Sequence, residues 1–109
     1  MRRLDVHYRP AARRDLRNIA RYLRESGASP GAVRRFIGRI ELRCLKIGDA
    51  PLGGRSRDDL LPGVRSVPFE DSAVIFYEVV GDRVRIINVF YGGRDYEALY
   101  RDEGAPPGG

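Results

Sequence analysis

Residues 73–91 read AVIFYEVVGDRVRIINVFY, and this stretch decides the fold. Residues 73–80 are apolar on both faces for most of their length, which is typical of a central strand. The pair Gly81-Asp82 predicts a two-residue hairpin turn, because glycine readily supplies a positive φ. Residues 84–91 predict the returning strand, and Gly92-Gly93 ends it. Two long apolar strands joined by a tight turn predict the middle of a β-sheet.

Two shorter strand signals flank this hairpin. Residues 4–8 alternate polar and apolar side chains with a period of two, which predicts a half-buried strand. Residues 64–69 predict a further strand, in which Pro68 marks an edge or a bend because proline cannot donate to a ladder. Residues 49–63, rich in glycine, proline and charge, predict a loop.

Helical spacing fills the chain between the first two predicted strands. Pro10 suits the first position of a helix, and Gly27 can end that helix after about residue 26. Ser29 caps a second helix, which runs from Pro30 to Ile47 before Gly48. Each helix has an apolar stripe, and arginines follow the opposite sides, namely Arg13, Arg17, Arg21 and Arg24, then Arg35, Arg39 and Arg43 with Lys46. The short link makes the two helices an antiparallel hairpin.

These elements predict the order β-α-α-β-β-β. The fold class is α+β, with a helical hairpin packed on one face of a small, mainly antiparallel sheet. Residues 94–101 could add one or two helical turns. We expect a single domain over residues 1–103, followed by a disordered tail over residues 104–109, which has nothing apolar to bury.

Composition narrows the possible functions. The 109 residues carry a net charge of +5, and residues 1–46 hold 13 basic against 4 acidic side chains. A basic half indicates an anionic partner, either nucleic acid or an acidic protein segment, although charge runs also cover ordinary solvated helix faces. No apolar run is long enough to span a membrane and the start does not read as a secretory signal, so we expect a cytoplasmic protein. The chain has one cysteine, Cys44, and one histidine, His7. We therefore expect no disulfide, no metal site and no cofactor.

The residues show no strong enzyme motif. His7 lies on the first predicted strand with no nucleophile beside it, and Cys44 falls on the apolar face of the second helix. What remains is a set of arginines and tyrosines in the second half of the chain: Arg55, Arg57, Arg65 and Arg94, with Tyr77, Tyr91, Tyr96 and Tyr100. Tyr77 alternates with Ile75 and Val79 and is expected in the core. The others could hold RNA or form protein interface hot spots, and spacing does not separate the two.

Several local patterns, in this order, resemble one protein family. They are Arg9-Pro10-Ala11-Ala12-x-x-Asp15-Leu16-x-x-Ile19-x-x-Tyr22-Leu23, Ala50-Pro51-Leu52-Gly53-Gly54-Arg55, Gly63-Val64-Arg65-Ser66, Val74-Ile75-Phe76-Tyr77-Glu78-Val79 and Ile86-Ile87-Asn88-Val89-Phe90-Tyr91-Gly92-Gly93-Arg94-Asp95. Together they resemble the ParE branch of the RelE/ParE superfamily, the toxins of type II toxin–antitoxin pairs. The resemblance covers about residues 4–101.

The resemblance implies a toxin that a co-expressed antitoxin holds silent, either ParD-like or another DNA-binding protein. ParE-like members inhibit DNA gyrase, whereas RelE-like members cut messenger RNA on the ribosome. Arg65, Arg94 and Tyr100 line up with residues of the RNA-cutting branch, but Val67 and Val74 stand where that branch places basic groups. Gyrase inhibition is therefore favoured. The alternatives are a ribosome-dependent endoribonuclease, and a non-toxic homologue that acts only in a repressor complex with its antitoxin.

We expect the target contacts among the sheet-side arginines and tyrosines. The set is Arg55, Arg57, Arg65, Tyr91, Arg94 and Tyr100. In ParE-like chains a histidine often precedes the Gly-x-Arg segment, and here Tyr91 takes that place. The residues that bind the antitoxin are not indicated by the sequence.

Overall fold

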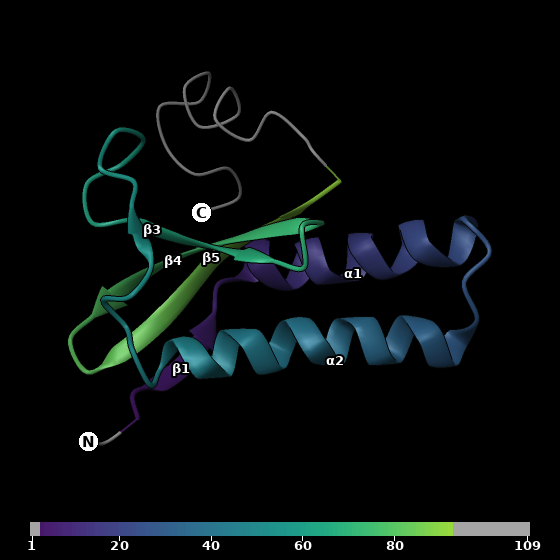
Figure 1. Ribbon diagram of the computed structural model, residues 1–109, viewed down its shortest axis with the longest axis horizontal. Helices are drawn as coiled ribbons and strands as arrows, with labels where there is room; N and C mark the ends of the chain where they lie inside the picture. The colour runs from purple at the N-terminus through teal and green to yellow at the C-terminus, as the bar shows by residue number, and fades with distance from the viewer. Residues whose placement is uncertain (1–2, 93–109) are drawn as a thin grey trace.

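A computed structural model describes residues 3–92, in which two helices cover one face of a five-stranded mixed sheet (Figure 1). The elements in chain order are β1 (Asp5–Tyr8), α1 (Pro10–Glu25), α2 (Pro30–Ile47), β2 (Arg55–Ser56), β3 (Arg65–Phe69), β4 (Ala73–Val80) and β5 (Arg83–Tyr91). The predicted order β-α-α-β-β-β is confirmed. The short strand β2 was missed, because two residues are too few to show a period.

The strands lie in the order β1-β5-β4-β3-β2, so the predicted hairpin of β4 and β5 is central. β1 is parallel to β5, and the other neighbours are antiparallel. β2 pairs with β3 at Arg65 and Ser66, and within residues 3–92 no strand pairs with the rest of β3 on that side. Pro68 lies in this uncovered part, as its missing N–H predicts.

Local sequence signals explain the helical hairpin. Pro10 opens α1, and the Ser29 hydroxyl accepts a hydrogen bond from the Ala32 N–H at 3.1 Å at the start of α2. Gly27 has a φ of +99°, which side chains disfavour, and it allows the short link between the helices. The two helices lie side by side against the sheet (Figure 1).

The sheet separates two apolar cores. The larger core lies between the helices and the sheet, and Ile40, Ile75 and Tyr77 in it are fully buried. A smaller cluster on the opposite face contains Phe76 and Phe90, whose rings meet edge to face with centroids 5.7 Å apart. The partly buried side chains that pack against this cluster include two leucines of the loop before β3, so this loop covers the second face.

β5 contains a bulge next to the residues that it uses to contact the first helix. Phe76 stands opposite Asn88 while Tyr77 stands opposite Ile86, so one residue of β5 has no partner on β4. The Asp15 carboxylate on α1 accepts hydrogen bonds from the Asn88 amide and from the Val89 N–H, both at 2.9 Å. Asp15 therefore ties α1 to the bulged part of β5.

Some expectations fall outside residues 3–92. These are the helical turns over residues 94–101, the domain end at 103 and the tail over residues 104–109, as well as Arg94 and Tyr100. Within the described part, no helix is long and apolar enough to cross a membrane.

Candidate functional site

The loop after α2 is held by the buried ring of Tyr77. The Tyr77 hydroxyl donates a hydrogen bond to the Pro51 carbonyl oxygen at 2.8 Å and accepts one from the Gly54 N–H at 3.0 Å. A side chain on Gly54 would place its Cβ 2.8 Å from the Tyr77 ring carbon Cε1. Gly54 thus allows the backbone to approach an aromatic ring, and Arg55, the next residue, is exposed at the surface.

Arg65 supports the same loop from β3. Its guanidinium Nη1 donates hydrogen bonds to the carbonyl oxygens of Leu52 at 3.2 Å and Gly54 at 2.9 Å. The side chain therefore orders the loop that carries Arg55. The target contact that the sequence predicts for Arg65 stays a prediction, and the structure adds these two contacts with the loop.

Among the predicted contact residues within residues 3–92, Arg57 is the most deeply buried. Its side chain is 4% exposed, and it makes two hydrogen bonds to the Asp59 carboxylate at 3.0 and 3.1 Å. The guanidinium also lies 5.9 Å from the centre of the Phe76 ring, and the pair with Arg57 lowers the pKa of Asp59. Arg57 therefore fastens the loop over the smaller core, which the sequence did not indicate.

The predicted contact residues do not form one cluster. Arg65 stands opposite Tyr77 on β4, whereas Tyr91 stands opposite Ala73, four residues away along that strand. Four residues of strand span about 13 Å, and β5 and β3 lie on opposite sides of β4, about 10 Å apart. Arg55, farther out on β2, is exposed, whereas its neighbour Ser56 and Arg65 line a hollow of about 390 Å³. Tyr91 belongs to a different surface.

That second surface is a groove between α1 and β5, which we call the α1–β5 groove. Its volume is about 320 Å³, and it is lined by Asp15, Asn18, Ile19, Tyr22, Val89, Tyr91 and Gly92. Tyr22 is 56% exposed, and its ring lies 5.8 Å from that of Tyr91. The sequence analysis missed Tyr22 as a site residue, although its place three residues after Ile19 puts it at the margin of the apolar stripe.

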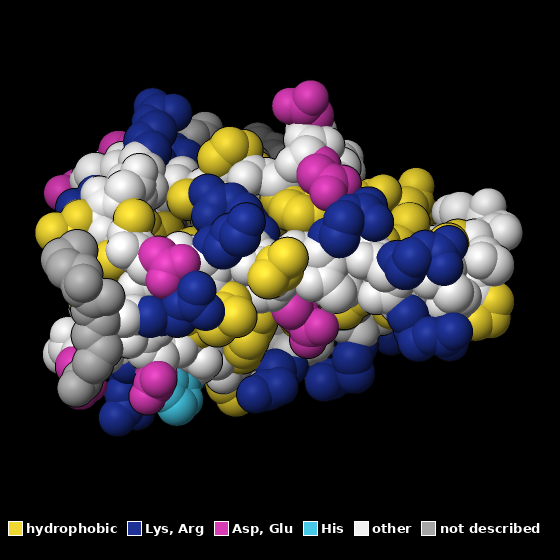
Figure 2. Space-filling view, turned by 60° about the horizontal axis from the view of Figure 1, so that its bottom comes forward, with side chains coloured by type: hydrophobic (Ala, Val, Ile, Leu, Met, Phe, Trp, Pro, Cys, Tyr) yellow, Lys and Arg dark blue, Asp and Glu magenta, His cyan; other side chains and the backbone are white. Residues whose placement is uncertain are grey.

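A third hollow, the α2–β3 groove, lies between the second helix and the end of β3. Its volume is about 300 Å³, and it is lined by Arg39, Leu42, Arg43, Lys46, Pro68, Phe69 and Glu70. Leu42 is 53% exposed. Basic side chains with hydrophobic ones between them gather on the face of the molecule that brings α2 forward (Figure 2). This surface also was not predicted, because it depends on a helix and a strand far apart in sequence.

An aromatic chain connects the two grooves through the interior. The Phe36 ring on α2 meets Tyr91 edge to face at 5.7 Å and Phe69 at 5.6 Å. Tyr91 continues the chain to Tyr22. The walls of both grooves are thus held by rigid ring contacts, which lowers the ordering cost of binding a partner there.

The reactive residue types of the described region lie apart from these grooves. Cys44 is fully buried, and burial raises the pKa of its thiol to about 11, as expected for a core residue. His7 is exposed on β1. Among residues 3–92 there is no group of three or more side chains that could hold a metal ion. The surfaces present apolar walls, tyrosines and arginines, the side chains that dominate protein interfaces.

Comparison with known proteins identifies the family. A solved structure described as the chromosomal ParDE TA system from P. aeruginosa superposes with a TM-score of 0.70 at 18% identity, covering 82% of this chain and 96% of that one. No match is found among the curated proteins. The family model described as the ParE toxin of the type II toxin–antitoxin system parDE matches residues 6–96. The resemblance in the sequence is thereby confirmed, and the chain belongs to the ParE toxin family.

Proposed function

We propose that this protein is the toxin of a type II pair, that it inhibits DNA gyrase by binding to it, and that a cognate antitoxin neutralises it. The match to the ParE toxin family over residues 6–96 supports the toxin assignment. The protein acts in the cytoplasm, where gyrase and nascent antitoxin would meet it.

The observation that carries gyrase inhibition over RNA cleavage is the packing of two valines. Val67 is 6% exposed and lies in the core under the helices, and Val74 packs against the cluster of Phe76 and Phe90 on the other face. RNA cleavage through the 2′-hydroxyl needs a base, an acid and cations around the scissile phosphate. Both positions that carry basic groups in the RNA-cutting branch are here used for apolar packing.

Of the contact residues that we propose for the target, the two that the structure describes lie at exposed or partly exposed positions. Arg55 is exposed on β2, Tyr91 is partly exposed at the end of β5, and Arg94 and Tyr100 follow Tyr91 in the sequence. Arg57 and Arg65 act indirectly, through the loops that they hold. Loss of one arginine from a desolvated hot spot costs about thirtyfold in affinity.

The test is expression of the protein alone, followed by two measurements in one culture. Plasmid supercoiling should collapse first, while bulk translation continues, and purified gyrase should lose supercoiling activity when the protein is added. Arg94→Ala should raise the inhibitory concentration about thirtyfold. The matched control Arg17→Ala with Arg21→Ala changes two exposed cations on α1 and should leave inhibition intact.

Two other results would assign a different function. Abrupt translation arrest with new 5′ ends on ribosome-bound message would show the endoribonuclease. Normal growth together with a tight complex with the neighbouring gene product would show a non-toxic member of a repressor complex. The antitoxin itself is tested by co-purification with the product of the adjacent reading frame, which should give one complex stable in moderate salt.

A further inference from the structure

The α2–β3 groove combines an apolar floor with a cationic rim. Leu42 and Pro68 supply exposed apolar surface, the buried Phe69 also lines the groove, and Arg39, Arg43 and Lys46 of α2 surround it with positive charge. Large exposed apolar side chains rimmed by charge are typical of protein interaction sites. An occupant that matches both properties is a peptide segment with apolar residues on one side and carboxylates on the other.

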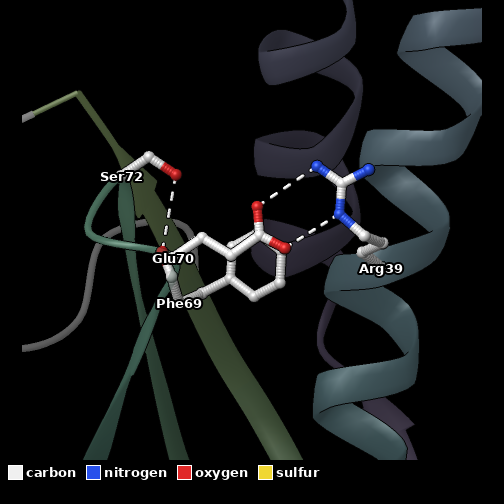
Figure 3. Close-up of polar contacts among 4 residues, drawn as sticks. All are labelled: Arg39, Phe69, Glu70 and Ser72. Carbon is white, nitrogen blue, oxygen red and sulfur yellow. Dashed lines mark hydrogen bonds and ion pairs between the residues drawn. The ribbon is translucent and has the colours of Figure 1, made fainter.

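One carboxylate already occupies part of the rim. Glu70, in the turn between β3 and β4, accepts hydrogen bonds from Arg39 at 2.8 Å and 3.1 Å, so that the two side chains form a bridge beside Phe69 (Figure 3). The side chains of Arg39 and Glu70 are 50% and 44% exposed. Ion pairs this exposed contribute little to stability, so a competing carboxylate can replace Glu70 at small cost.

The backbone of this turn is strained. Glu70 has a φ of +47° and Asp71 a φ of +56°, a conformation that residues with side chains seldom adopt. The Arg39 bridge holds the strained turn against α2. Release of the bridge frees the Glu70 side chain, whereas the Ser72 N–H, which donates to the Phe69 carbonyl oxygen at 3.0 Å, keeps the turn backbone in place, so the movable part of the rim is this side chain.

The edge of β3 indicates the form of the occupant. β2 covers β3 at Arg65 and Ser66 alone, and the next part of the edge contains Pro68, which has no N–H to donate. A strand added here would lack a ladder hydrogen bond, whereas a helix binds by its side chains and needs none. The occupant therefore docks as an amphipathic helix.

We propose that the α2–β3 groove binds an acidic amphipathic helix of the antitoxin, and that a carboxylate of this helix displaces Glu70 from Arg39. The inference rests on the proposed function for the identity of the partner. Glu70 then competes with the carboxylate of the partner for Arg39 and weakens partner binding. RNA, the other anionic partner, has no aliphatic side chains to cover Leu42 and Phe69.

The experiment uses the full chain and synthetic probes. The first probe is a 16-residue helical peptide with leucines on one face and glutamates on the other, the second replaces its glutamates by lysines, and the third is a single-stranded RNA 12-mer. Binding is followed by calorimetry and by chemical shifts in ¹⁵N-labelled protein. The acidic peptide should bind with shifts centred on Leu42 and Phe69, and the other two probes should bind at least about tenfold more weakly.

A double-mutant cycle tests the displacement itself. Glu70→Gln removes the competitor and should tighten acidic-peptide binding about two- to fivefold, the range of an exposed ion pair. In an Arg39→Gln background the same change should have little effect, because the cation that Glu70 occupies is already gone. The matched control is Glu41→Gln, which also removes one negative charge, at an exposed position on α2 outside the groove. It should change the affinity for the acidic peptide little.

Three results would overturn the inference. Glu70→Gln could leave acidic-peptide binding unchanged or weaken it. It could also tighten binding equally with and without Arg39, which would mean that Glu70 acts only through the net charge of the protein. RNA or the lysine peptide could bind at the groove as well as the acidic peptide. Because the peptide replaces the antitoxin, these outcomes are independent of the gyrase and co-purification results that decide the proposed function.

Discussion

Tyr77→Phe tests the loop geometry most directly, because it removes one oxygen atom and leaves the ring in place. The hydroxyl is the point at which β4 meets the loop after α2, through Pro51 and Gly54. Tyr77 is fully buried, so water cannot replace the missing oxygen without entering the core. The aromatic packing under the helices stays unchanged.

The expected loss of stability follows from the two hydrogen bonds. Each contributes about 1 kcal/mol net, and the buried groups left unpaired, the Pro51 carbonyl oxygen and the Gly54 N–H, add a desolvation penalty. We expect the free energy of unfolding to fall by about 2–3 kcal/mol. For a domain of this size, that lowers the Tm by roughly 10 °C.

The assay is urea unfolding of the variant and the wild type, followed by circular dichroism. Tyr22→Phe is the matched control, because it removes the same hydroxyl group from a tyrosine that is 56% exposed. The control should change stability by less than about 0.5 kcal/mol. If Tyr77→Phe also stays within that margin, the hydroxyl does not hold the loop and the reasoning is refuted.

Three further predictions follow from single contacts. Gly54→Ala should destabilise the fold by about 1–3 kcal/mol in the same urea assay, because its methyl group would press on Tyr77, and an unchanged midpoint would mean that the loop yields freely. Cys44 should resist a thiol reagent in the folded protein and react on unfolding, because burial raises the pKa of its thiol to about 11; rapid labelling at pH 8 under native conditions would contradict its core position. Arg39 lowers the pKa of Glu70 in the folded state, so their pair stabilises the fold above the unfolded pKa of about 4.3 and is lost as pH falls through the folded value. The stability difference between wild type and Glu70→Gln should therefore be present at pH 7 and shrink as the pH falls below about 4.3, and a difference that stays constant would refute the pairing.

Elements whose signals are local could be predicted from the residues alone. Pro10 and Ser29 mark helix starts because they act within one turn, and Gly81 marks the hairpin because its positive φ is a property of that residue. Periodicity gave the faces of these elements, and with them the burial of Tyr77 and Cys44. The ordered local patterns were also enough to indicate the family that the family model confirms.

The tertiary structure decided what each polar side chain does. In the sequence, Arg57 and Arg65 cannot be distinguished from the exposed Arg55. In the folded protein the Arg57 guanidinium binds the Asp59 carboxylate, and the Arg65 guanidinium donates to two backbone carbonyl oxygens of the loop after α2. Arg39 and Glu70 are 31 residues apart, and the groove beside them forms only where α2 meets the end of β3. Periodicity specifies which face of an element is apolar, whereas hydrogen bonds and grooves depend on distances between elements that only packing sets.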